Sequence, residues 1–233
     1  MSTNPVLVAI DTTDATRADA LIAATAPHIG GVKLGLEYFC AYGPERVRAA
    51  ATGRFLFLDL KLHDIPNTVA GAVRAVVPLA PDLLTVHASG GAEMMKAARA
   101  AAEQGAVGGK RLKLIGVTVL TSFDNDDLDA VGQRGPVRDQ VLRLAALSQA
   151  SGLDGVVCSP REVAALRAEC GPSFVLVVPG IRPVGAELGD QKRVMGPREA
   201  VEAGATYLVI GRPITAAADP AAAARAIAVE LGH

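Results

Sequence analysis

The sequence has no tryptophan, and its three tyrosines and five phenylalanines bring the aromatic content to only 3%. So few rings leave few platforms on which nucleic-acid bases could stack. Positive charge is not in excess either, because 23 Lys and Arg residues face 24 Asp and Glu residues and the net charge is −1. A protein that holds a nucleic-acid backbone normally carries a basic surface. We therefore expect no nucleic-acid partner.

Cysteines and long apolar segments are also scarce. The three cysteines, Cys40, Cys158 and Cys170, are far apart, odd in number and without C-x-x-C spacing. This pattern predicts reduced, buried thiols in a cytoplasmic protein and no metal site built on cysteine. Gly, Pro or charged residues interrupt every apolar stretch before about 18 residues, so no segment is expected to cross a membrane. The N-terminus lacks the positive region of a signal peptide, and we predict a soluble protein.

Short apolar runs alternate with segments of helical character along the whole chain. Eight runs are found, at residues 6–10, 32–34, 55–60, 83–86, 114–120, 155–157, 174–178 and 207–210. Strands this apolar are typical of a parallel sheet that is covered on both faces and joined by right-handed crossovers. Segments 92–104 and 137–151 are rich in Ala with charges at helical spacing, and Pro220 marks a closing helix. The sequence predicts an α/β fold, a (β/α)8 TIM barrel, with residues 1–233 as one domain.

An open, doubly wound sheet is the alternative architecture. Such a sheet would need a ligand loop after its first strand, and glycine usually provides it. The segment that follows the first run, from Asp11 to Asp14, contains no glycine. The barrel is therefore favoured.

The most informative segment is residues 59–66, Asp-Leu-Lys-Leu-His-Asp-Ile-Pro, directly after an apolar run. Side chains of a β-strand alternate between its two sides, so Asp59 and Lys61 project to the same side, and Asp64 follows in the turn. Neighbouring carboxylates keep a lysine charged, which suits a group that delivers a proton to a carbanion. A buried structural ion pair is the other interpretation.

Polar residues end most of the predicted strands, where a barrel has its active site. They are Asp11, Lys33, Asp59, Lys61, His87, Thr121, Ser122, Arg182 and Arg212. Some have ordinary structural interpretations: Asp11 as a helix cap, His87 as a hydrogen-bonded core histidine. Arg182 and the turn Gly211-Arg212-Pro213 follow the last two strands, where barrels commonly bind phosphate. The alternative there is a tight turn with solvated arginines.

Seven motifs in this order resemble the orotidine 5′-phosphate decarboxylase family over nearly the whole chain. They are residues 9–11 (Ala-Ile-Asp), 32–35 (Val-Lys-Leu-Gly), 59–68 (Asp-Leu-Lys-Leu-His-Asp-Ile-Pro-Asn-Thr), 119–122 (Val-Leu-Thr-Ser), 179–182 (Pro-Gly-Ile-Arg), 189–191 (Gly-Asp-Gln) and 209–213 (Val-Ile-Gly-Arg-Pro). Leu62 and Ile10 depart from the usual residues at packing positions. The resemblance implies cofactor-independent conversion of orotidine 5′-monophosphate to uridine 5′-monophosphate and CO2.

The resemblance also implies a role for each candidate residue. Lys61 would protonate C6 of the pyrimidine, with Asp59 beside the departing carboxylate. Lys33 and Asp64 would complete the charge network, and Asp64 and Thr68 would reach the ribose bound in the partner subunit of a homodimer. The remaining contacts would be Asp11 and Lys33 with the ribose, Thr121 and Ser122 with the base, and Gln191, Gly211 and Arg212 with the phosphate, under a loop that starts at Arg182.

Two other functions remain open at this point. A magnesium-dependent sugar-phosphate decarboxylase or aldolase of the same superfamily would share the D-x-K-x-x-D arrangement but need more carboxylate ligands. Glu37 is a conceivable ligand and equally an acid in the first turn of a helix. The second alternative is a barrel without catalysis that binds a nucleotide as a sensor.

Overall fold

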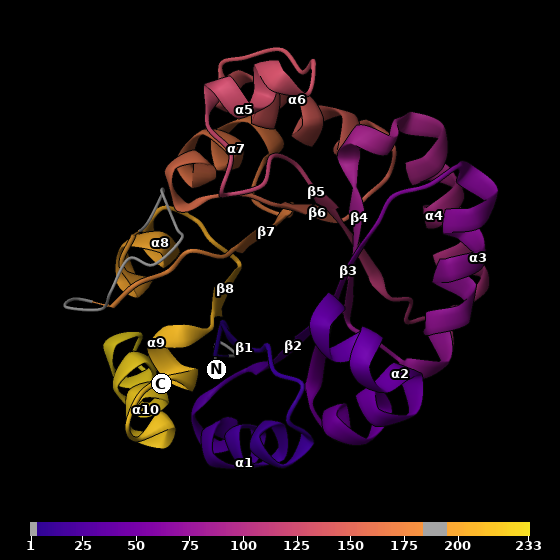
Figure 1. The fold of residues 1–233 in the computed structure, drawn as a ribbon. Helices are drawn as coiled ribbons and strands as arrows, with labels where there is room; N and C mark the ends of the chain where they lie inside the picture. Colours follow the sequence, from indigo (N-terminus) through magenta and orange to yellow (C-terminus); the bar gives the residue numbers. More distant parts are fainter. Residues whose placement is uncertain (1–3, 184–194) are drawn as a thin grey trace.

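Eight parallel strands close into a barrel in the computed structural model, which describes residues 4–183 and 195–233 (Figure 1). The strands are β1 Val6–Ile10, β2 Gly31–Gly35, β3 Phe55–Leu62, β4 Leu83–His87, β5 Lys113–Val117, β6 Gly155–Val157, β7 Val175–Val178 and β8 Tyr207–Ile210. Each strand pairs with the next in the chain, and β8 pairs with β1. The predicted TIM barrel is confirmed.

Helices form the outer ring around these strands (Figure 1). The α-helices are α1 Ala15–Thr25, α2 Leu36–Ala51, α3 Pro66–Val76, α4 Ala92–Gln104, α5 Asn125–Ala130, α6 Val137–Ala150, α7 Val163–Cys170, α8 Pro197–Glu202, α9 Arg212–Thr215 and α10 Pro220–Glu230. Four 3₁₀ turns supplement them at Ala26–His28, Val77–Leu79, Ala88–Gly90 and Pro160–Glu162. The closing helix α10 begins with Pro220 after its N-cap Asp219, as predicted.

Alternation along the strands divides the apolar residues into two layers. One strand residue in two points outward and packs against the helices, as Leu56 and Leu58 of β3 do. The residues between them point inward, where Phe57 joins a smaller cluster inside the barrel. This cluster consists of Leu7, Phe57, Leu83, Ile115, Val175 and Val177, and it fills the barrel below the carboxyl ends of the strands. Those ends are thus the place where the barrel can accept a ligand.

Three details differ from the sequence expectation. The strand predicted at 114–120 ends at Val117, because the Thr118 hydroxyl donates to the Val157 carbonyl (2.8 Å) and the chain then turns. The third strand continues past the predicted end to Leu62. Cys40 is exposed on the solvent side of α2, so the prediction of three buried thiols is wrong at that position, whereas Cys158 and Cys170 are buried.

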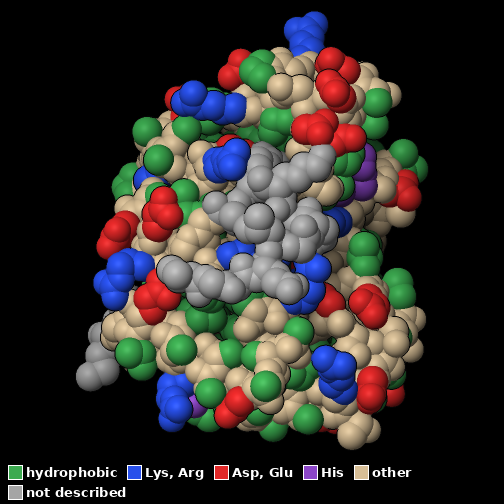
Figure 2. All heavy atoms as spheres, turned by 60° about the vertical axis from the view of Figure 1, so that its left-hand side comes forward, with side chains coloured by type: hydrophobic (Ala, Val, Ile, Leu, Met, Phe, Trp, Pro, Cys, Tyr) green, Lys and Arg blue, Asp and Glu red, His purple; other side chains and the backbone are tan. Residues whose placement is uncertain are grey.

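Charges of both signs are mixed over the side of the molecule that lies on the left in Figure 1, as Figure 2 shows for the described residues.

Among residues 4–183 and 195–233, no helix is both long and apolar enough to cross a membrane.

Leu83 offers a test of the inner cluster, because its side chain is fully buried inside the barrel. We expect Leu83→Ala to lower the free energy of unfolding by about 2–5 kcal/mol, through lost burial and an unfilled cavity. Val229→Ala on the outer face of α10, where Val229 is 65% exposed, is the control and should change it by less than about 0.5 kcal/mol. Urea denaturation at one protein concentration measures both, and equal effects of the two substitutions would contradict this core assignment.

Candidate active site

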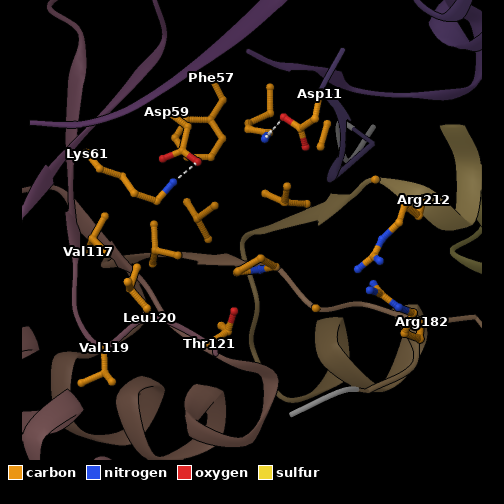
Figure 3. A pocket seen from close by; sticks show the side chains of 18 residues that line it. Asp11, Phe57, Asp59, Lys61, Val117, Val119, Leu120, Thr121, Arg182 and Arg212 are labelled. Atoms are coloured by element: carbon orange, nitrogen blue, oxygen red, sulfur yellow. Dashed lines mark hydrogen bonds and ion pairs between the residues drawn. The ribbon is translucent and has the colours of Figure 1, made fainter. Parts of the chain in front are cut away.

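An ion pair between Asp59 and Lys61 lies at the carboxyl end of β3 and faces a cavity (Figure 3). The Lys61 Nζ donates to Asp59 Oδ2 at 2.6 Å, and the side chain of Asp59 is only 13% exposed. Asp59 points inward by the regular alternation that also turns Phe57 inward. The predicted common side for Asp59 and Lys61 is therefore confirmed.

The backbone of Lys61 is not that of a regular strand. Its φ is +50°, in the left-handed region that residues with a side chain rarely occupy. The pairing of β3 with β4 also shifts its register between Leu58 and Leu62, on either side of this residue. A non-glycine residue in this conformation is a local strain of the kind that gathers at functional sites.

A second ion pair joins neighbouring strands. Lys33 in β2 donates to Asp11, which directly follows β1, at 2.6 Å. Asp11 is therefore not the helix cap considered from the sequence, because Asp14 caps α1 by accepting from the Arg17 backbone N–H. Gly35 leaves room for this pair, since a Cβ there would lie 3.2 Å from Lys33 Nζ and 3.5 Å from Asp11 Oδ1.

Two arginines form the opposite side of the cavity. Figure 3 shows the guanidinium groups of Arg182, after β7, and Arg212, at the start of α9, pointing toward one another. Burial and the positive charge of Arg212 lower the pKa of Arg182. An anion bound here would interact favourably with both guanidinium groups.

The cavity has a volume of about 440 Å³ and an apolar floor that includes Phe57, Val117 and Val157. Most predicted site residues line it: Asp11, Lys33, Asp59, Lys61, Thr121, Arg182, Gly211 and Arg212. Three others are exposed and do not contribute to its lining: Asp64, Thr68 and Ser122. Gln191 lies outside the described residues. The barrel thus brings side chains from both halves of the chain to one opening.

Asp64, the predicted second acid next to Lys61, is turned toward its own backbone, where its Oδ1 accepts from the Ile65 N–H at 2.6 Å. Among the described residues of its own chain, Lys61 therefore contacts one carboxylate, that of Asp59. A site with Lys61 between two carboxylates would need a carboxylate from elsewhere.

Thr85, in the middle of the apolar run of β4, is not among the site residues predicted from the sequence. It is fully buried, and its hydroxyl donates to Asp59 Oδ1 at 2.9 Å. The signal was present in the sequence, because one threonine interrupts Leu83, Leu84 and Val86 at an inward position of the strand.

His87 is partly buried at the end of β4, and its ring lies 5.2 Å from that of His63. Burial, then the neighbouring charges of His63 and Lys61, lower the pKa of His87. The partial burial agrees with the interpretation of His87 as a core histidine, but the hydrogen bond of that interpretation is not seen among the described residues. A neutral imidazole is favoured beside an ammonium group.

The lowered pKa of His87 predicts how stability responds to pH. Below the ordinary histidine pKa of 6.5 the unfolded chain takes up a proton that the folded His87 resists. The free energy of unfolding should therefore fall between about pH 7.5 and about pH 5.5, and His87→Gln should make this fall smaller. His63→Gln, which removes only one of the neighbouring charges, should have a weaker effect. Urea denaturation at the two pH values measures this, and an unchanged pH dependence in His87→Gln would refute the prediction.

Among residues 4–183 and 195–233, no group of three His, Cys, Asp or Glu side chains is arranged to hold a metal ion. Glu37, the metal ligand considered from the sequence, is exposed in the first turn of α2 and is not among the residues that line the cavity.

Comparison with known proteins agrees with this geometry. The sequence profile of the Orotidine 5′-phosphate decarboxylase / HUMPS family matches residues 4–227. Orotidine 5′-phosphate decarboxylase of Rhodospirillum rubrum is 58% identical, over 99% of this chain and 95% of the relative, and that of Paramagnetospirillum magneticum is 57% identical, over 98% and 99%. The crystal structure of orotidine 5′-phosphate decarboxylase from Lactobacillus acidophilus has a TM-score of 0.87 and 39% identity, and covers 99% of this chain and 100% of its own. The chain thus belongs to the orotidine 5′-phosphate decarboxylase / HUMPS family.

Proposed function

We propose that this protein decarboxylates orotidine 5′-monophosphate to uridine 5′-monophosphate and CO2, the last step of uridine monophosphate synthesis, without a cofactor. The observation that carries the proposal is the cavity that has the Asp59–Lys61 pair on one side and two arginines on the other. Its volume of about 440 Å³ is within the usual range for sites of small organic ligands. The relatives, which are decarboxylases of this nucleotide, support the same substrate.

Lys61 is the proton donor in this proposal. The bond between C6 of the pyrimidine and the carboxylate breaks, CO2 leaves, and the electron pair remains on C6. A proton then passes from Lys61 Nζ to C6. A carbanion without a cofactor as electron sink needs positive charge fixed beside it beforehand, and the 2.6 Å contact with Asp59 fixes the ammonium of Lys61. Asp59 would also repel the substrate carboxylate, which is lost in the transition state.

The opposite end of the cavity suits the phosphate. Arg212 and the backbone N–H of Gly211 are the proposed contacts, together with Gln191 and Arg182. The positive charges of Arg182 and Arg212 repel each other, and a doubly charged anion that binds nearby would stabilise both arginines. Asp11 and Lys33 would contact the ribose, and Thr121 and Ser122 the base; Thr121 lines the cavity and Ser122 follows it.

A homodimer would complete the site. Asp64 and Thr68 are exposed at the mouth side of the barrel, and the neighbouring Ile65 is 66% exposed. Leu36, directly after the adjacent strand β2, is 50% exposed. In the proposed dimer the other subunit would cover these two apolar side chains. In such a dimer Asp64 and Thr68 would reach the ribose in the partner subunit, and Asp64 would supply the second carboxylate near the partner's Lys61.

We place this reaction in the cytoplasm. All three cysteines lie in described segments and none forms a disulfide, which fits a reducing compartment.

Incubation of the EDTA-treated protein with orotidine 5′-monophosphate tests the activity. We expect loss of substrate absorbance in the ultraviolet and formation of uridine 5′-monophosphate, at the same rate with and without added magnesium. Activity only with magnesium and a sugar phosphate would instead identify a sugar-phosphate enzyme of this family. Binding of uridine 5′-monophosphate without any turnover would identify a nucleotide sensor.

Hybrid dimers test the shared site. A mixture of Lys61→Ala and Asp64→Ala chains should form hybrid dimers in which one site has an intact Lys61 and an intact partner Asp64. After full subunit exchange the mixture should regain about a quarter of the parent activity, since half of the dimers are hybrids with one complete site. The matched control mixes Lys61→Ala with Asp59→Ala, which affect the same chain's site and should restore nothing. No recovery in the first mixture, despite demonstrated exchange, would rule out a site completed by Asp64 of the partner subunit.

A further inference from the structure

Thr85 is a fully buried hydroxyl directly behind the Asp59–Lys61 pair. It lies in β4 between the apolar residues Leu84 and Val86 and does not line the cavity. Its Oγ1 accepts from the backbone N–H of Lys61 at 2.8 Å and donates to Asp59 Oδ1 at 2.9 Å. One hydroxyl therefore contacts the backbone of the lysine and the carboxylate of the aspartate.

The first of these contacts stabilises an unfavourable backbone. Lys61 has φ +50°, and the ladder between β3 and β4 shifts its register around it. Where a ladder is interrupted in this way, a buried N–H needs another acceptor. The Thr85 hydroxyl is that acceptor, so the turn of the chain that directs Lys61 into the cavity depends on a side chain of the next strand.

The second contact orients the carboxylate. Asp59 accepts from Thr85 on Oδ1 and from Lys61 Nζ on Oδ2, at 2.9 and 2.6 Å. With both oxygens engaged, the plane of the carboxylate is fixed, and with it the position of the ammonium group. A hydroxyl can donate only one hydrogen bond, so its donation to Asp59 leaves its lone pairs for the Lys61 N–H.

We propose that Thr85 is a positioning residue for the reaction, which holds Asp59 and the backbone of Lys61 so that the ammonium group points at the reacting carbon. This role rests on the proposed function. Displacement of a reacting group by about 1 Å can cost about 100-fold in rate, so the loss of the hydroxyl should be visible in kcat.

The matched variants are Thr85→Val, which keeps the shape and loses the hydroxyl, and Thr85→Ser, which keeps the hydroxyl. We expect Thr85→Val to lower kcat about 10- to 100-fold, with little change in KM and in the affinity for uridine 5′-monophosphate. Thr85→Ser should retain kcat within a few-fold of the parent. A crystal structure of Thr85→Val should show a rotated Asp59 carboxylate or a changed φ at Lys61.

Several outcomes would overturn this role. One is a Thr85→Val variant with the parent kcat. Another is an equal loss of kcat in the valine and serine variants that parallels a fall in their thermal midpoints, which would mean that Thr85 acts through packing alone. If Thr85→Val does not fold, Thr85→Ala provides the same comparison with serine. An inactive parent protein would instead refute the proposed function itself, and it is measured first in the same assay.

Discussion

The ion pair between Asp59 and Lys61 is the interaction on which the site depends. Placing two charges at the mouth of an apolar barrel costs desolvation, which their 2.6 Å contact and the Thr85 hydrogen bond offset. A pair of this kind is weak evidence for stability, because well-packed apolar residues often serve as well. Its position beside the cavity, with Lys61 in a left-handed backbone conformation, instead favours a chemical role.

The barrel supplies what this pair needs. Inner side chains such as Phe57 and Leu83 fill the interior below it, so the cavity lies above a packed interior at the carboxyl ends of the strands. Lys33 and Asp11 repeat the pairing of lysine and carboxylate on the neighbouring strands, and Gly35 leaves the space that Lys33 requires. The arginines lie across the cavity. Binding energy from a phosphate there can position the reacting end of the same molecule.

Much of this arrangement could be predicted from the sequence. The strands are short apolar runs separated by amphipathic helices, and this pattern depends on the burial of most residues in each run. Residues such as Lys61 and Arg212 were identifiable as candidate site residues, because a charged side chain at the end of a buried strand is unfavourable unless it is paired or has a function. Two strand ends were less predictable: β5 stops at Val117, where the Thr118 hydroxyl donates to the neighbouring strand, and β3 continues to Leu62.

Other features follow from three-dimensional contacts that no local pattern encodes. The left-handed conformation of Lys61 arises in a register shift between two strands, and Thr85 acts on residues 24 and 26 positions away in the chain. Side-chain alternation correctly placed Asp59 and Lys61 on one side of the strand. It does not reveal that the backbone of Lys61 leaves the regular strand conformation. Nor could the sequence show that Asp64 turns to its own backbone and not to Lys61.

The decarboxylation rate of Lys61→Ala, measured beside its affinity for uridine 5′-monophosphate, tests whether Lys61 is the proton donor. The proposed proton transfer predicts a fall in kcat of at least about 100-fold, the usual minimum contribution of a positioned general acid, while the nucleotide still binds. Lys96→Ala, at a 58%-exposed lysine of α4, is the control and should retain the parent rate. A Lys61→Ala variant that binds the nucleotide and turns over substrate at the parent rate would show that Lys61 is not the proton donor.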